Sequence, residues 1–191
     1  MPRQTFVLLT VVGVVGVPVA VGAGTAKPQA AAVVAMSVQG VWQQGASYVV
    51  VLRAPATGIA ARLLPIWIGG REAQAIQMGL NNTRPPRPLT HDLLQSVIAQ
   101  LGATVERVEV TQLKQSVFIG QLALRDAAGK RHLIDARPSD LIALAVGRKL
   151  PVHVAQAVLD RAGRKHFPTP SPNAPLPSPA PQLRPKKGTG I

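Results

Sequence analysis

The chain has 191 residues, which is enough for one domain with a hydrophobic core and additional segments at its ends. It contains no cysteine, so disulfides, zinc–thiolate sites and thiol nucleophiles are excluded, and an aromatic content of 3% argues against stacking of single-stranded bases on aromatic side chains. The formal net charge of +13 favours nucleic acid, anionic lipid or an acidic polymer as partner, although a basic tail that only improves solubility explains the charge equally well.

The first 26 residues predict a signal peptide. Arg3 precedes an uncharged apolar run at residues 6–17, and small residues follow it, as in secretory leaders. An N-terminal membrane anchor is the alternative, because residues 6–26 approach the length that spans a bilayer. We therefore expect an exported protein, periplasmic or secreted if the leader is cleaved and membrane-anchored otherwise.

The chain then predicts a linker at residues 27–34, followed by β structure. Three segments rich in Val, Leu and Ile predict strands: 33–39, 47–53 and 63–68. Residues 54–61 contain proline and glycine and predict a hairpin turn, while Pro65 indicates that the third strand lies at a sheet edge or carries a bulge. Two glycines then lead into a helix predicted at 71–80.

The second half of the chain alternates helices and strands. Thr90 is the predicted cap of a helix that ends at Gly102, and Pro138 suits the first turn of a later helix. Further strands are predicted at 105–110, 117–124, 131–134 and 151–154, and further helices at 140–149 and 155–161. Residues 164–191 are rich in Pro and Ser with scattered Lys and Arg, and predict a disordered basic tail.

This order of elements predicts an α+β fold. A single domain at residues 35–163 would contain a mixed, largely antiparallel sheet and three to four short helices. The strand end at 66–69 resembles the strand end at 133–136, since each leads into a helix, and this similarity indicates an internal duplication.

Two junctions concentrate charged side chains at predicted helix starts. The first is Arg87–Asp92, which includes His91, and the second is Asp135–Asp140, which includes Arg137 and Ser139. Free N–H groups and the helix dipole favour an anion at such a start. The structural alternative is that the acidic residues, together with Glu72 at the first helix, only complement helix dipoles and pair with arginines. No Walker loop, dinucleotide fingerprint, zinc-peptidase motif or esterase elbow is present.

At these junctions the chain resembles the bifunctional nuclease family. The matching blocks occur in family order: Leu64–Gly69 with Glu72-Ala73 and Ile76, Arg87–Leu93, Asp135–Asp140 with Ile142–Ala145, Pro151–Val154, and Val158–Asp160. The resemblance implies cleavage of both DNA and RNA, and we expect the hydrolysis to show low sequence specificity.

From these residues we expect three groups of functional side chains. The expected catalytic residues are His91 as general base, Asp92, Asp135 and Asp140. The expected ligands of Mg²⁺ or Mn²⁺ are Glu72, Asp135 and Asp140, and the expected phosphate-binding residues are Arg87, Arg137 and Ser139. This hypothesis requires both junctions to meet in space. The alternatives are a noncatalytic binding or regulatory domain, and an envelope protein whose basic tail binds anionic lipid; association into a homo-oligomer is left open.

Overall fold

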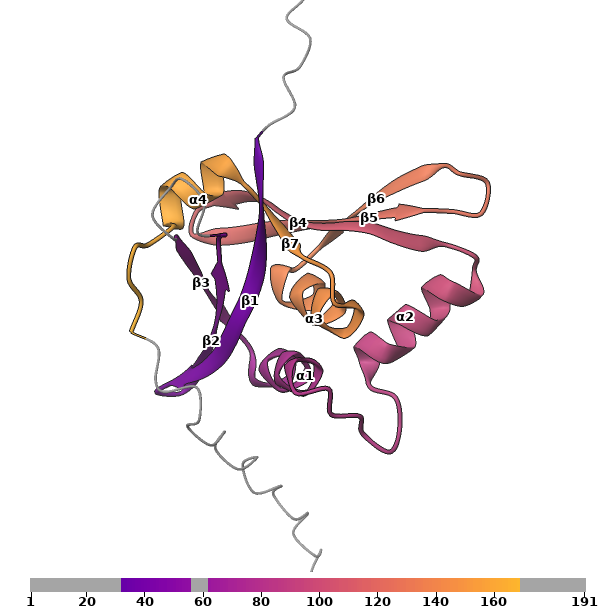
Figure 1. Cartoon of the computed structure of the whole chain (residues 1–191), viewed down its shortest axis with the longest axis horizontal. Helices are drawn as coiled ribbons and strands as arrows, with labels where there is room; N and C mark the ends of the chain where they lie inside the picture. The colour runs from indigo at the N-terminus through magenta and orange to yellow at the C-terminus, as the bar shows by residue number, and fades with distance from the viewer. Residues whose placement is uncertain (1–31, 56–61, 169–191) are drawn as a thin grey trace, which may run out of the picture. The chain divides into compact units, whose positions relative to one another are not determined.

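The computed structural model describes residues 32–55 and 62–168 (Figure 1). The predicted signal peptide, residues 56–61 of the predicted turn and residues 169–191 of the predicted tail lie outside these ranges. Across the described ranges, every helix falls short of the length and apolar character needed to cross a bilayer.

Seven strands form one sheet in the order β3-β2-β1-β7-β4-β5-β6. All neighbouring strands are antiparallel except β4 and β7, which are parallel. The strands are β1 (Val33–Gln44), β2 (Ser47–Arg53), β3 (Leu63–Ile68), β4 (Thr104–Lys114), β5 (Val117–Arg125), β6 (Arg131–Ala136) and β7 (Val152–Ala155). The predicted α+β class with a mixed, largely antiparallel sheet is confirmed, and the strand that contains Pro65 lies at a sheet edge, as its proline indicated.

The structure describes four helices, each close to its predicted position: α1 (Gly70–Leu80), α2 (Thr90–Gln100), α3 (Pro138–Arg148) and α4 (Gln156–Ala162). Helices α1 and α4 each start within one residue of the prediction, and the starts of α2 and α3 differ in ways that concern the candidate site. Leu89, not Thr90, is the N-cap of α2, and α3 begins at Pro138, two residues before Asp140. The fixed φ of proline suits the first helical position and explains the earlier start of α3.

The two halves of the chain repeat one arrangement. Strands β1, β2 and β3 form an antiparallel meander that leads into α1, and β4, β5 and β6 form a second meander that leads into α3. Strand β7 lies between the two meanders, beside β1 and β4. This arrangement agrees with the internal duplication that the sequence indicates.

The sheet curves around α3, and α1 and α2 lie on either side of this helix (Figure 1). Leu141, Ile142 and Leu144 of α3 are almost completely buried, and they pack with residues of both meanders in one core. Gly120 of β5 makes this packing possible, because a Cβ atom there would lie 2.6 Å from Leu141 Cδ1 and 2.7 Å from the Ala136 carbonyl oxygen.

A smaller apolar cluster contains Trp42, Val49, Val51, Leu63 and Phe167. The backbone of Arg164 forms a bridge with Leu63, and the Phe167 ring meets the Trp67 ring edge-on with 6.1 Å between centroids. The fold therefore continues to Phe167, past residue 163 where the sequence predicts that the domain ends. It also begins at Val33, inside the predicted linker.

Candidate active site

Each of the first three helices carries an acidic residue at its third position. These residues are Glu72 in α1, Asp92 in α2 and Asp140 in α3. A carboxylate in the first turn is stabilised by the free N–H groups and the dipole of the helix. Asp92 serves the helix directly, because its Oδ2 accepts a hydrogen bond of 2.9 Å from the Leu89 backbone N–H.

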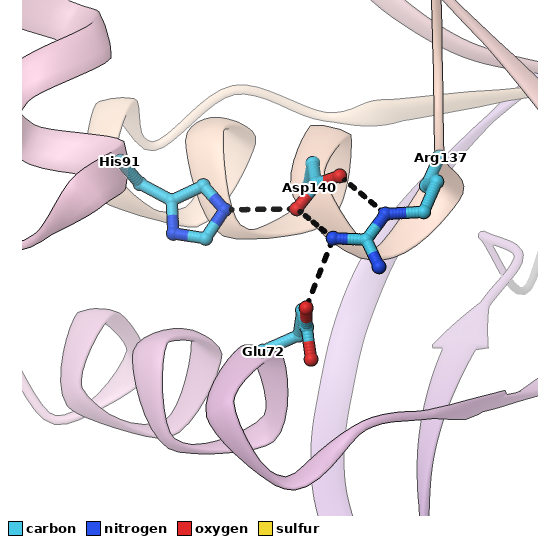
Figure 2. Close-up of polar contacts among 4 residues, drawn as sticks. All are labelled: Glu72, His91, Arg137 and Asp140. Atoms are coloured by element: carbon cyan, nitrogen blue, oxygen red, sulfur yellow. Dashed lines mark hydrogen bonds and ion pairs between the residues drawn. The ribbon is translucent and has the colours of Figure 1, made fainter.

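The carboxylates of Glu72 and Asp140 meet on one guanidinium group. Arg137 is the N-cap of α3, and its Nε and Nη2 donate to the two oxygens of Asp140 at 2.8 and 3.1 Å. Nη2 also donates to Glu72 Oε1 at 3.0 Å (Figure 2). The two acidic residues therefore come from equivalent positions of the repeated meander-and-helix units, and Arg137 joins them.

Arg137 is oriented by these bonds but remains accessible. Its side chain is 68% exposed, whereas that of Glu72 is 17% exposed. Hydrogen bonds and charge from Asp140, followed by those from Glu72, raise the pKa of Arg137. Within the described ranges Nη1 has no hydrogen-bond partner, so its two N–H groups can bind an anion.

Asp140 also binds His91, the second residue of α2. His91 Nε2 lies 3.2 Å from Asp140 Oδ1 (Figure 2), and the two side chains are 17% and 31% exposed. Burial alone would raise the pKa of Asp140, but hydrogen bonds from Arg137 and His91, together with the charge of Arg137, outweigh it and hold the pKa below its ordinary value of 3.8. An ionised Asp140 only accepts, so it favours the His91 tautomer with a proton on Nε2 and a free lone pair on Nδ1.

His91 lines a pocket of about 460 Å³ beside this cluster. Helices α1, α2 and α3 and the proline-rich loop that precedes α2 all contribute to the wall, which includes Gly79, Gly147 and Arg84. The glycines let α3 approach its neighbours: a Cβ at Gly79 would lie 2.8 Å from Val146 Cγ1. Arg84 is a cation at the pocket that was not predicted from the sequence, because it lies three residues before the Arg87–Asp92 junction.

Four of the predicted site residues do not join the cluster, and one of them is Asp92, whose carboxylate binds the Leu89 backbone instead. Arg87 is exposed and does not line the pocket, and Ser139 is buried with 9% of its surface exposed. Asp135 is exposed in β6, and its side chain makes no hydrogen bond or ion pair with the described residues. Strand alternation directs it away from α3, because the neighbouring Ala136 packs on the helix side of the sheet opposite Gly120.

The predicted metal-ligand set is therefore not assembled. Asp135 lies on the opposite side of the sheet from α3, while Glu72 and Asp140 both bind Arg137. Among the residues that the structure describes, no three His, Asp or Glu side chains are grouped as metal ligands. These positions do not fit the predicted Mg²⁺ or Mn²⁺ site.

The fold and the site define a small α+β domain in which a hydrogen-bonded His–Asp–Arg–Glu cluster lies where helix starts meet, beside a pocket. The sequence model of the bifunctional nuclease domain matches residues 50–166, which is more than half of the chain. The chain belongs to the bifunctional nuclease domain family.

Similar proteins include one without a characterised function and several plant nucleases. An uncharacterized protein of Mycobacterium tuberculosis is 41% identical over 102 residues, covering 53% of this chain and 60% of that protein. Bifunctional nuclease 1 of Oryza sativa subsp. indica is 29% identical over 112 residues, covering 57% of this chain and 34% of that protein. Bifunctional nuclease 1 of Arabidopsis thaliana is 28% identical over 94 residues, covering 48% of this chain and 29% of that protein. The chain thus matches at most 60% of the length of these relatives.

Proposed function

We propose that this protein hydrolyses phosphodiester bonds in DNA and RNA with little sequence preference, and that Glu72, His91, Arg137 and Asp140 form its catalytic centre. Family membership supports the reaction class. The observation that carries the proposal is the hydrogen-bonded chain from Glu72 through Arg137 and Asp140 to His91, which ends in an accessible guanidinium nitrogen and a free imidazole nitrogen.

In this proposal His91 is the general base. Asp140 holds Nε2–H, so the Nδ1 lone pair accepts a proton from water as the water oxygen attacks phosphorus. A bond forms between the water oxygen and phosphorus, and the bond from phosphorus to the leaving oxygen breaks. The proton that His91 has taken then neutralises the leaving oxygen, either directly or through a water molecule.

Arg137 would stabilise the charge that develops on the phosphoryl oxygens. Its Nη1 group presents two N–H donors, and Glu72 and Asp140 fix the plane of the guanidinium before substrate arrives. Such prior orientation matters because the protein does not have to reorganise during the reaction. Arg84 in the pocket wall would attract the neighbouring phosphate of a nucleic acid strand.

Cleavage of plasmid DNA and of RNA by a His91→Ala variant tests this proposal. Loss of the general base should lower the rate on the order of 10²- to 10⁴-fold. His132→Ala is the matched control, because His132 Nε2 also binds a carboxylate, Asp126 Oδ2 at 2.7 Å, outside the cluster. Equal rates for the two variants would reject the proposed role of His91. Assistance by Mg²⁺ or Mn²⁺ stays a prediction, and parallel reactions with EDTA test it.

A noncatalytic binding domain is the second candidate. The acidic residues at the third position of three helices favour it, since each also has a purely stabilising role there. Binding to nucleic acid that weakens steeply with salt, without turnover at any metal concentration, would support this function over hydrolysis.

Export through residues 1–26 and contact of the basic tail with an anionic membrane remain proposals. Because Arg164 and Phe167 belong to the fold, the tail should be removed after Pro168. Sedimentation with anionic liposomes should fall on that truncation if the tail binds lipid, and should be unchanged if it does not.

A further inference from the structure

The two edge strands of the sheet differ in how they are covered. At the β3 edge, Pro65 removes a backbone donor, and the segment from Arg164 to Phe167 lies against Leu63 and Trp67. Strand β6 pairs with β5 on one side only, and its other edge has no partner strand among the described residues. It contains no proline. An uncovered edge of this kind is a template for pairing with another chain.

Most of the exposed apolar side chains lie on two neighbouring elements, α2 and β6. His91 of α2 binds Asp140, four residues after β6, and a Cβ atom at Gly102, just after α2, would lie 3.3 Å from Ala127 in the turn before β6. Nine large hydrophobic side chains are exposed in the described ranges. Six of them lie on α2, on its C-cap residue or on β6: Leu93, Leu94, Val97, Leu101, Leu133 and Ile134. Leu93, Val97 and the C-cap residue Leu101 are spaced by four residues, so they form one stripe. A contiguous exposed apolar area of this type indicates an interaction surface.

The stripe on α2 points away from α3. His91 contacts Asp140, and Gln95, one turn later, lies against Gly147, so this side of α2 faces α3. Ile98 is the one residue of α2 that is buried. Leu93, Val97 and Leu101 therefore occupy a part of the helix that no described element covers.

Charges along β6 are complementary to those of a second, antiparallel copy of the same strand. Arg131 pairs with Glu106 of its own chain at 3.1 Å, but half of its side chain is exposed and can meet a second carboxylate. Arg131, Leu133 and Asp135 lie on one face of the sheet, opposite the face on which Ala136 contacts the core. In an antiparallel pair, directly opposed residues share a face. A twofold axis at Leu133 would therefore place the Leu133 residues of the two copies opposite each other. It would also place Arg131 of each copy opposite Asp135 of the other copy.

We propose that two copies of this chain pair through β6 in this register to form a symmetric dimer. The sheet continues across the axis through antiparallel β6 strands, and its far face carries two ion pairs between Arg131 and Asp135 around the Leu133 side chains. On the helix side, Ile134 and the Leu93, Val97 and Leu101 stripe of each copy lie next to the axis and are covered by the partner copy. Such a closed, isologous interface uses the uncovered edge without leading to a filament.

Disulfide cross-linking of the full chain tests this register, because the protein has no cysteine of its own. In Leu133→Cys the two thiols would face each other, with Cα atoms about 4.5–5.5 Å apart, which suits a disulfide. Mild oxidation should convert most of this variant into a reducible species of twice the 20.0 kDa chain mass.

Two control variants separate this interface from other contacts. Asp135→Cys places its thiols four residues apart along the paired strands, roughly 14 Å, so it should not cross-link. Val117→Cys, which replaces another exposed side chain outside β6 and α2, should also form no disulfide-linked species under oxidation. Cross-linking of either control as extensive as that of Leu133→Cys overturns the register.

Sedimentation equilibrium of the wild-type chain gives a second, independent result. The expected mass is twice that of the chain, and Leu133→Lys should restore the monomer, with an unchanged circular dichroism spectrum as the check on folding. A monomeric wild-type protein overturns the proposal. A Leu133→Lys protein that remains dimeric also overturns it, because the two copies would then associate through another surface.

Discussion

Arg137 differs from an ordinary ion-paired arginine because its partners fix it while most of its side chain stays accessible. Two carboxylates take three of its N–H groups and leave Nη1 toward solvent. The planar guanidinium can make this arrangement because its donors point in fixed directions. A lysine ammonium at the same position would bind one carboxylate as a point charge and would not present a fixed pair of donors.

Arg137→Lys should therefore lose activity although its charge is unchanged. Removing an oriented donor to a developing oxyanion costs about 10²- to 10³-fold in kcat. Initial rates of cleavage of a short DNA duplex measure this loss. Arg62→Lys is the control, since Arg62 also pairs with a carboxylate, that of Asp160 at 2.6 Å, away from the pocket. If Arg137→Lys cleaves as fast as Arg62→Lys, donor geometry at Arg137 plays no part.

At the scale of the elements, the close contact between α3 and β5 positions the start of α3, and with it Arg137 and Asp140. Gly120→Ala should lower the free energy of unfolding by about 1–3 kcal/mol, because its Cβ would meet both Leu141 and a backbone carbonyl oxygen. Gly147→Ala in α3 is the control. A Cβ atom there would lie 2.6 Å from the flexible end of the Gln95 side chain, which can move away, and alanine is a better helix former than glycine, so little stability should be lost. Urea denaturation compares the two. A Gly120→Ala protein as stable as Gly147→Ala would contradict this packing.

Strand β7 carries a histidine whose charged form the fold disfavours. Burial, followed by the charge of Arg107, lowers the pKa of His153 below 6.5, although the charge of Glu109 opposes this shift. The buried Nδ1 of His153 has no hydrogen-bond partner among the described residues. The unfolded chain thus binds a proton more readily than the folded chain at this position.

His153 should therefore weaken the fold in mild acid. Above pH 6.5 the titration of His153 does not change the free energy of unfolding. As the pH falls from 6.5 through the lower pKa of the folded state, the free energy of unfolding decreases progressively. A His153→Gln variant should lose less stability than wild type between about pH 7 and about pH 5. Urea midpoints across this range provide the measurement. Parallel curves for the two proteins would show that His153 does not titrate in this way.

Element positions could be predicted from the sequence because their signals are local. Proline at the start of α3 and glycine after α2 act through nearby backbone geometry. The face of Asp135 was harder to predict, since β6 is an edge strand whose sequence does not alternate cleanly between apolar and polar residues. The contact between Glu72 and Arg137 joins residues 65 positions apart. It depends on how the two meanders are placed, which no local pattern specifies.

At the scale of the whole molecule, the repeated arrangement explains why a site forms where it does. Each meander delivers its helix start to the same side of the sheet, so the acidic residues of α1 and α3 reach one arginine. The insertion of β7 between the meanders joins them into one sheet without separating these helix starts. The proposed centre lies between the two repeats and requires both.

The most direct test of this account is the rate of phosphodiester cleavage by Asp140→Asn compared with Asp160→Asn. Asp140 links Arg137 to His91, so its replacement should remove the orientation of both groups and lower the rate on the order of 10²-fold or more. Asp160 forms an exposed ion pair with Arg62, and its replacement should leave the rate unchanged. Equal rates for these two variants would contradict the assignment of the cluster as the catalytic centre.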